Sequence, residues 1–237
     1  MEGKVILITG ASGGMGKELA NYFAGKGHSL ALHANNNPVS IPESENIKHY
    51  KADLTEETEC QMLISEVIEQ FGRIDVLINN AGISKSSVLW KTSFEDWNDT
   101  LAVNLSAPFF LSKHIAPHLR DQESGRIINI SSVVAQTGFV GTAAYAASKA
   151  GLIGLTKTAA RELASKNVTV NALALGYFSV GMIEDVPEPI REDLIKNIPV
   201  GKLGDPDTVC ATIDYLISDS GGYITGQTIN LNGGLYS

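Results

Sequence analysis

Short, continuously apolar runs alternate along this chain with longer segments of helical periodicity. Between the runs, residues such as Leu63, Ile64 and Val67 recur at a spacing of three or four and form one apolar face. Strands that are apolar throughout and separated by helices indicate a parallel sheet covered on both faces. The pattern predicts a three-layer, doubly wound (Rossmann-type) α/β fold of about seven strands. The expected strands are residues 5–8, 30–32, 47–51, 75–79, 126–131, 168–173 and 228–230.

Local signals mark the expected helix ends. Thr55 is the predicted N-cap of one helix, and Gly72 follows that helix. Asp205 is the predicted N-cap of another, with Pro206 at its first position. The expected helices are residues 17–26, 55–71, 93–119, 142–166 and 205–218.

Residues 177–204 have weak periodicity and come soon after an expected strand. In an open α/β sheet, ligands bind beyond the carboxyl ends of the strands. We therefore expect an irregular, mobile substrate lid over residues 177–204.

The composition limits the class of protein. We expect residues 1–237 to form a single domain, since the composition shows no break. The first apolar run is too short for a signal peptide or a membrane span, which predicts a soluble, cytoplasmic protein. The net charge of -8 opposes binding to nucleic acid or to an anionic membrane. The two cysteines lack metal-ligand spacing, so no metal site is expected.

A glycine-rich turn, T-G-A-S-G-G-M-G at residues 9–16, joins the first strand to the first helix. Gly10 permits a tight turn, Gly14 allows backbone to approach a pyrophosphate, and Gly16 allows close packing of helix and sheet. The helix N-terminus offers N–H donors, which makes Ser12, Gly13 and Met15 further candidates for cofactor binding. Glycine is also required in such turns for structural reasons, so the motif alone leaves both interpretations open.

The end of the second strand bears on the choice of cofactor. It continues as His33-Ala34-Asn35-Asn36-Asn37, without the carboxylate that often binds a ribose 2′-hydroxyl. The asparagines could donate hydrogen bonds to a 2′-phosphate, which favours NADP(H), with Asn35 as the candidate residue. The alternative is a surface turn that does not touch the cofactor.

Tyr145 and Lys149 lie four residues apart in an expected helix, so that their side chains share one face. A free tyrosine has a pKa of about 10, and a nearby ammonium favours its phenolate form. The pair therefore suits proton transfer at a carbonyl. Taken alone, such spacing occurs by chance in many helices, and an exposed pair without a role is the simpler interpretation.

Other motifs accompany this pair. Two serines, Ser131 and Ser132, end an expected strand, and an earlier strand ends in an N-N-A-G motif at residues 79–82. With these features the chain resembles the short-chain dehydrogenase/reductase family along essentially its whole length. Within that family it is most similar to the 3-oxoacyl-(acyl carrier protein) reductases. Residues 125–128, 145–154 and 223–228 carry this closer likeness.

The resemblance implies a role for each catalytic candidate. Tyr145 would protonate the alkoxide formed during carbonyl reduction, and Ser132 would polarise the carbonyl, leaving Ser131 a structural role. Lys149 would tune Tyr145 and hold the nicotinamide ribose. Asn104 would anchor a water in a proton relay to Lys149.

The resemblance also implies cofactor contacts. Asp53 would accept a hydrogen bond from the adenine amino group, with Leu54 beside the ring, although Asp53 could also be an ordinary loop residue. Further contacts would come from Asn80, Ala81 and Gly82, and from the segment around Gly176 and Phe178.

Three departures from the family pattern stand out. In the family, a proline and a threonine usually follow the strand expected at residues 168–173. Leu175 and Val180 replace them here, which removes one cofactor contact. Gly13 stands where many NADPH-using relatives have arginine. The two arginines that dock acyl carrier protein correspond to Glu123 and Lys166, and Glu123 would repel an acidic carrier.

The sequence therefore supports one leading hypothesis and two alternatives. The leading one is reduction of a 3-oxoacyl group carried by acyl carrier protein or coenzyme A. One alternative is a dehydrogenase or reductase of a free small ketone or secondary alcohol, and the other is a non-catalytic dinucleotide sensor. The resemblance also implies a homotetramer, with a dimer as the alternative.

Overall fold

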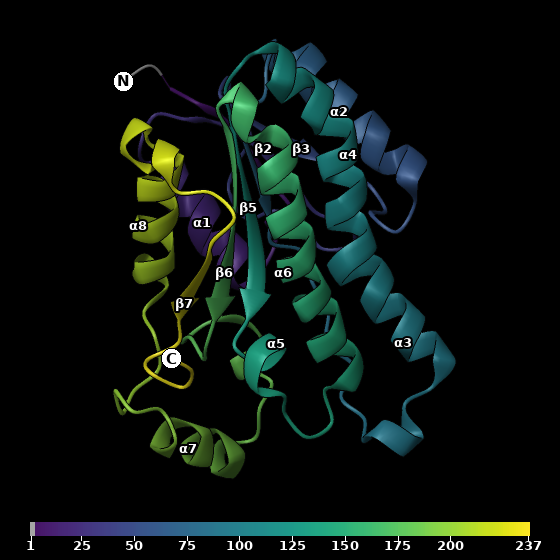
Figure 1. Ribbon diagram of the computed structural model, residues 1–237, viewed down its shortest axis with the longest axis vertical. Coiled ribbons are helices and arrows are strands. Elements are labelled where there is room, and N and C mark those ends of the chain that lie inside the picture. Colours follow the sequence, from purple (N-terminus) through teal and green to yellow (C-terminus); the bar gives the residue numbers. More distant parts are fainter. Residues whose placement is uncertain (1–2) are drawn as a thin grey trace.

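The fold is built on a parallel sheet of seven strands in the order β3-β2-β1-β4-β5-β6-β7 (Figure 1). The computed structural model describes residues 3–237, so positions 1–2 of the expected domain lie outside the described part. The strands are β1 (Val5–Ile8), β2 (Ser29–His33), β3 (Ile47–Tyr50), β4 (Val76–Asn79), β5 (Gly125–Ser132), β6 (Val168–Leu175) and β7 (Thr228–Leu231). The chain starts mid-sheet, proceeds outward to β3, returns to β4 and proceeds to the other edge. The predicted doubly wound fold is thereby confirmed.

Helices cover both faces of the sheet, as Figure 1 shows. The helices are α1 (Gly14–Ala24), α2 (Glu57–Phe71), α3 (Phe94–Leu101), α4 (Ala107–Asp121), α5 (Val134–Thr137), α6 (Ala143–Leu163), α7 (Glu188–Lys196) and α8 (Pro206–Ile217). The helices α2, α4 and α6 pack on one face, and α1 and α8 pack on the other. Within residues 3–237, none of these helices combines the length and the apolar composition needed to cross a bilayer.

Alternation along each strand explains why the apolar runs are continuous. Val5 and Leu7 of β1 belong to the core under α2, α4 and α6, whereas Ile6 and Ile8 belong to the core under α1 and α8. Successive strand residues point to opposite faces, and both faces are buried. Each central strand therefore needs apolar side chains at nearly every position.

Buried amides tie the central strands to a helix. Asn79 of β4 donates from Nδ2 to Oδ1 of Asn129 in β5 at 2.8 Å, and Asn129 donates to the hydroxyl of Thr156 in α6 at 2.8 Å. Thr156 donates in turn to the carbonyl of Leu152 at 2.8 Å. This chain of hydrogen bonds satisfies polar groups that would be costly to bury without partners.

Two sequence-based predictions about helices are wrong. The helix expected to start at Thr55 begins at Glu57, with Glu56 at the N-cap position. The Thr55 hydroxyl instead donates to Asp53 Oδ1 at 2.7 Å, which removes it from a capping role. The expected lid, 177–204, is not irregular throughout, because it contains a 3-10 turn (Gly181–Ile183) and α7.

A physical reason for the second miss is visible in α7. The helix is only nine residues long and none of them is buried, so its few apolar positions give a short and weak periodic signal. The short helix α5, which follows β5 directly, was not predicted either. The single-domain organisation and the mobility of the lid stay predictions.

Replacing Leu77 by alanine is expected to lower the free energy of unfolding by about 2–5 kcal/mol, because a fully buried side chain of β4 would leave a cavity. Urea unfolding followed by circular dichroism measures this loss. The matched control is Met62→Ala, since Met62 is 52% exposed, and its effect should stay within about 0.5 kcal/mol. Equal effects of the two substitutions would contradict the placement of Leu77 in the core.

Candidate active site

The glycine turn lies against the end of β4 with almost no space between the backbones. Gly10 has a φ of +67°, and a Cβ added there would lie 2.9 Å from the Cα of Ala81. A Cβ at Gly16 would collide with the carbonyl oxygen of Gly10. Only glycine meets both requirements.

Asn80 holds this turn in place. Its side-chain amide donates to the carbonyls of Thr9 at 2.9 Å and of Gly10 at 3.2 Å. The backbone amides of Asn80 and Ala81 donate to the Thr9 hydroxyl at 3.0 and 3.1 Å. Of the predicted cofactor-binding residues, Asn80 and Ala81 are therefore joined directly to the glycine turn.

The start of α1 forms a cradle suited to phosphate. At its N-cap, Gly13, no side chain of the described residues caps the helix, and space is open where a Cβ would stand. Ser12 and Met15 are partly exposed beside it. The first N–H groups of α1 thus lack a capping side chain, and the helix dipole favours an anion there.

The candidates on the adenosine side lie beyond β2 and β3. Asn35 is exposed just after β2. The carboxylate of Asp53 accepts hydrogen bonds from the hydroxyl and the backbone N–H of Thr55, and these bonds lower its pKa, so that it stays charged. Leu54 is only 5% exposed and belongs to the core under α2, which leaves little of its side chain for a ligand.

On the catalytic side, β5 and α6 meet. Tyr145 and Lys149 lie on α6, and the Lys149 Nζ is 5.8 Å from the centre of the Tyr145 ring. This Nζ donates to the carbonyl of Ile130 at 2.8 Å. The hydroxyl of Ser131 donates to the carbonyl of Lys149 at 2.9 Å, whereas the hydroxyl of Ser132 accepts from the Val134 N–H at 3.2 Å. Ser131 therefore fastens α6 to β5.

Burial dominates the acid–base properties of the pair. It raises the pKa of the Tyr145 phenol, an effect that the nearby Ser132 hydroxyl opposes and Tyr177 reinforces. It lowers the pKa of Lys149 to about 8. The predicted lowering of the Tyr145 pKa by Lys149 is not found. Desolvation has the largest effect on this pKa, and the Lys149 ammonium donates to the carbonyl oxygen of Ile130. Tyr145 is therefore held in its protonated form.

Asn104 lies in a π-helical turn, Ala102–Ser106, between α3 and α4. Its side-chain amide donates to the Ile83 carbonyl at 2.9 Å and to the Ser148 hydroxyl at 3.1 Å, while its Oδ1 accepts from the Ile83 N–H at 2.8 Å. A Cβ added at Gly82 would lie 3.3 Å from Asn104 Oδ1 and 3.4 Å from Lys149 Nζ. Asn104, Lys149 and Gly82 thus lie close together.

Two features of this cluster were missed by sequence reasoning. The sequence placed Asn104 in a regular helix, whereas the structure widens one turn around it. Ser148 joins Asn104 to α6, and its hydroxyl donates to the Tyr145 carbonyl at 2.7 Å. Its position directly before Lys149 was the only signal available.

The segment after β6 runs along the edge of the site. A Cβ at Gly176 would lie 2.7 Å from the Cα of Asn232, so backbone packs closely there. Phe178 is only 7% exposed and belongs to the core under α1 and α8, which leaves chiefly its backbone near the site. Further along, Gly181 lies against the glycine turn, because a Cβ at Gly14 would be 3.0 Å from the Gly181 Cα.

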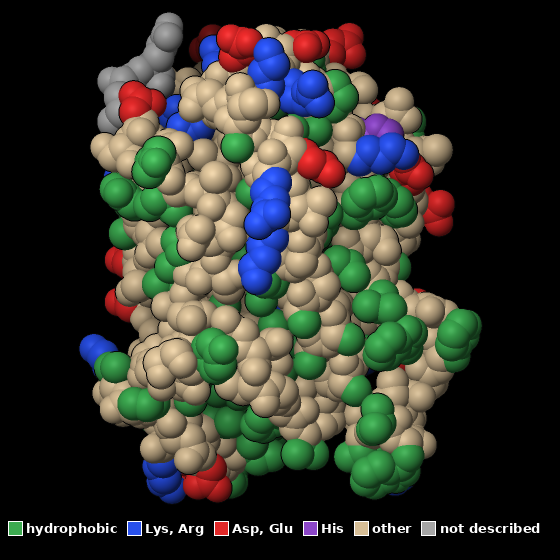
Figure 2. Space-filling model, viewed as in Figure 1, with side chains coloured by type: hydrophobic (Ala, Val, Ile, Leu, Met, Phe, Trp, Pro, Cys, Tyr) green, Lys and Arg blue, Asp and Glu red, His purple; other side chains and the backbone are tan. Residues whose placement is uncertain are grey.

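Exposed apolar side chains gather around this end of the sheet. In Figure 2 hydrophobic side chains are frequent toward the lower end, to which the arrowheads of β5, β6 and β7 point in Figure 1. Segments that follow β4, β5 and β6 supply them. They are Leu89, Trp90, Phe94, Phe139, Val140, Met182, Ile190 and Val200. The Ser87 N–H donates to the Gly141 carbonyl at 2.9 Å, which joins two of these segments next to α6.

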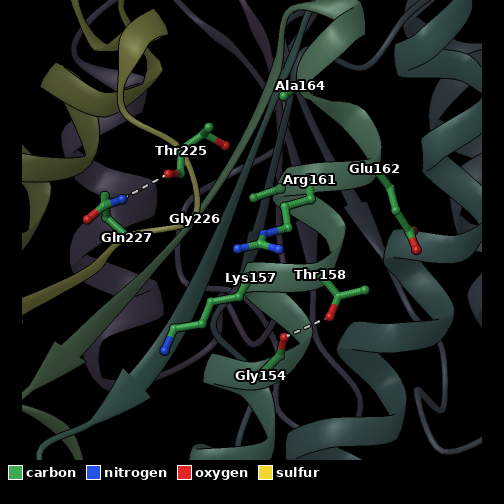
Figure 3. A pocket seen from close by; sticks show the side chains of 10 residues that line it. Gly154, Lys157, Thr158, Arg161, Glu162, Ala164, Thr225, Gly226 and Gln227 are labelled. Carbon is green, nitrogen blue, oxygen red and sulfur yellow. Dashed lines mark hydrogen bonds between the residues drawn. The ribbon is translucent and has the colours of Figure 1, made fainter.

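A separate groove of about 1120 Å³ follows the C-terminal half of α6 and the segment before β7 (Figure 3). Lys157, Arg161 and Gln227 are among the residues that line it. Its lining contains none of the predicted catalytic or cofactor-binding residues. The groove is therefore distinct from the site at the carboxyl edge of the sheet.

Comparison with known proteins agrees with this geometry. A family model described as short chain dehydrogenase matches residues 4–190. A 3-oxoacyl-[acyl-carrier-protein] reductase of Thermotoga maritima is 40% identical, covering 99% of this chain and 98% of the relative. Proteins of the same name from Staphylococcus epidermidis (39% identical, covering 98% and 99%) and Vibrio cholerae (38%, covering 100% and 98%) are also similar. The chain thus belongs to the short-chain dehydrogenase family.

Proposed function

We propose that this protein reduces 3-oxoacyl thioesters to 3-hydroxyacyl thioesters with NAD(P)H. Family membership implies a nicotinamide dinucleotide cofactor, and similar proteins that span the whole chain are named as 3-oxoacyl-[acyl-carrier-protein] reductases. The observation that carries the proposal is that Ser132, Tyr145, Lys149 and Asn104 lie close together beside the phosphate cradle.

The cofactor, when bound, supplies the hydride. Ser132 donates a hydrogen bond to the substrate carbonyl oxygen, and Tyr145 gives its proton to that oxygen as negative charge develops there. Burial supports this role because it keeps the phenol protonated. Lys149 places a positive charge near the phenol and the ribose, and Asn104 fixes the loop at Ile83 and the Ser148 hydroxyl beside it.

The cradle fits a dinucleotide. The pyrophosphate of the bound dinucleotide would lie at the start of α1, and its adenosine would reach Asp53 and Asn35. The nicotinamide end would lie toward Gly176. Residues proposed to bind the cofactor are Gly10, Ser12, Gly13, Gly14, Met15, Gly16, Asn35, Asp53, Leu54, Asn80, Ala81, Gly82, Tyr145, Lys149, Gly176 and Phe178. Given their burial, Leu54 and Phe178 would contribute mainly backbone contacts.

The apolar side chains around the carboxyl edge favour a substrate with an acyl chain over a free small ketone. An exposed apolar surface next to a catalytic site is a feature of sites that bind apolar groups. The non-catalytic alternative is disfavoured because the proton-transfer groups are present and converge.

The carrier of the acyl group is a finer question. Lys166 forms an exposed ion pair with Glu123 at 2.8 Å, so its charge is already partly compensated. An acidic acyl carrier protein would find a weaker basic patch here than two arginines provide. We keep acyl carrier protein as the proposed carrier, with coenzyme A as the second candidate.

We also propose a cytoplasmic homotetramer. The exposed Phe109 on α4 and the open groove along α6 lie on the helical layer that the family's long helices use for assembly.

Tyr145→Phe is expected to lower kcat for a 3-oxoacyl pantetheine thioester by about 10²–10⁴-fold, because the proton donor is removed. NADPH consumption followed by absorbance measures this loss, and NADPH affinity should stay within about threefold. Tyr223→Phe is the control, since Tyr223 is fully exposed and should change neither value. Near-native turnover by Tyr145→Phe would rule out the proposed mechanism.

The kcat of reduction is expected to fall as pH rises through about 8, because the charged form of Lys149 predominates below its pKa of about 8 and is lost above it. A pH profile of kcat tests this expectation. Lys157→Met, which removes an exposed lysine of the same helix, should leave the profile unchanged. A flat wild-type profile between about pH 7 and 9.5 would show that Lys149 does not titrate in this range.

NADPH is expected to bind about tenfold more tightly than NADH, since no carboxylate follows β2 to repel a 2′-phosphate. Asn35→Asp should reverse this preference by placing a negative charge beside the phosphate, whereas Asn37→Asp, in the same exposed turn, should have a smaller effect. Dissociation constants from titration calorimetry distinguish these cases. Tighter binding of NADH by the wild type would refute the proposed preference.

A further inference from the structure

His33 is a buried imidazole that the proposed mechanism does not use. It is the last residue of β2 and only 2% exposed. The backbone N–H of Gly10 donates to its Nδ1 at 3.4 Å, and its Nε2 lies 2.9 Å from the carbonyl oxygen of Ala52. Because Nδ1 accepts, Nε2 carries the proton and donates to Ala52. Burial lowers the pKa of His33, in agreement with this neutral form.

The two hydrogen-bond partners of the imidazole belong to two separate segments, and each segment is proposed to bind the adenosine half of the cofactor. Gly10 opens the glycine turn, and Ala52 directly precedes Asp53, the candidate partner of the adenine amino group. The His33 backbone strengthens the same junction, since its carbonyl accepts from the Ala11 N–H at 2.8 Å. The following residue, Ala34, donates to the Tyr50 carbonyl at 3.0 Å. One residue thus fixes the turn after β1 relative to the end of β3.

Backbone hydrogen bonds join β2 to each of these segments separately, and the imidazole adds one bond to each. The pairings of β1 with β2 and of β2 with β3 end at Ile8↔Leu32 and His33↔Tyr50. Beyond these pairs, the Gly10 amide and the Ala52 carbonyl are joined through the imidazole. A side chain with an acceptor and a donor on opposite edges is required to bridge an N–H and a C=O in this way.

We infer that His33 is a positioning residue for the adenosine half of the cofactor. This inference rests on the proposed dinucleotide binding and adds a residue that touches neither the reacting atoms nor the cofactor. His33 acts through Gly10 and Asp53, whose relative position decides whether the pyrophosphate and adenine sites can be filled together. Pre-organisation of this kind contributes to affinity because binding then requires less ordering.

The test compares three substitutions of His33. His33→Leu removes both side-chain hydrogen bonds, His33→Asn keeps an acceptor for the Gly10 N–H, and His33→Gln keeps a donor for the Ala52 carbonyl. We expect His33→Leu to raise KM for NADPH about tenfold, with kcat within about twofold and KM for the acyl substrate unchanged. The Asn and Gln variants should show smaller increases, since each retains one bond.

Fragments of the cofactor separate positioning from general damage. Calorimetry with adenosine 2′,5′-bisphosphate should show the same loss of affinity as NADPH, whereas nicotinamide mononucleotide should bind as it does to the wild type. His28→Leu is the matched control, because the His28 Nδ1 also accepts a backbone N–H, that of Lys4 at 3.0 Å, just before the start of β2. It should leave KM for NADPH unchanged.

Several results would overturn the inference. Unchanged affinity of His33→Leu for the adenosine fragment would do so, as would an equal rise in KM for NADPH in His28→Leu. A fall in kcat of His33→Leu as large as the rise in KM would also overturn it. If His33→Leu does not fold, unchanged affinity in both the Asn and Gln variants has the same consequence. Failure of the wild type to bind NADPH or NADH would instead refute the proposed function.

Discussion

The close approach of the glycine turn to the end of β4 is the contact on which the site depends. Side chains at Gly10 or Gly16 would collide with backbone atoms of Ala81 or of the turn itself. Because both positions lack a Cβ, Asn80 can reach the carbonyls of Thr9 and Gly10. The carboxyl ends of β1 and β4 are thereby fixed relative to each other, and the start of α1 is directed at the space beyond them.

The catalytic half depends on burial rather than on a charge pair. Lys149 has a backbone carbonyl as its hydrogen-bond partner, not a carboxylate, so its charge is stabilised only partly and its pKa falls to about 8. Tyr145 is partly buried beside it, and desolvation raises the pKa of its phenol, so it stays protonated. The two groups therefore differ in how they respond to a ligand, since added negative charge near Lys149 would stabilise the ammonium while the phenol keeps its proton.

Structural features that repeat along the chain can be predicted from the sequence, whereas features that depend on a single contact cannot. Burial of both faces produces apolar runs in the central strands, and all seven expected strands agree with the observed ones to within two residues at each end. The widened turn at Asn104 leaves no periodic trace, and the hydrogen bonds that Asn104 makes there reach Ile83, a residue 21 positions away. Apolar residues such as Leu54 and Phe178 pack in the core, and the sequence alone does not distinguish such packing from contact with a ligand. His33 has no sequence signal because its partners come from two other segments.

In residues 177–204, the expected lid, a backbone contact stands beside a side-chain contact that is missing. Val180 has no hydroxyl to offer, but the next residue, Gly181, brings the lid backbone against Gly14. The Gly181 N–H is held by the Glu184 carboxylate at 3.0 Å, and no side chain separates the two glycines. Contact between residues 177–204 and the phosphate cradle thus depends on the absence of a side chain at Gly14 and Gly181. A larger residue at either position would hold the lid away from the turn, while Tyr145 and Lys149, on α6, would keep their own partners.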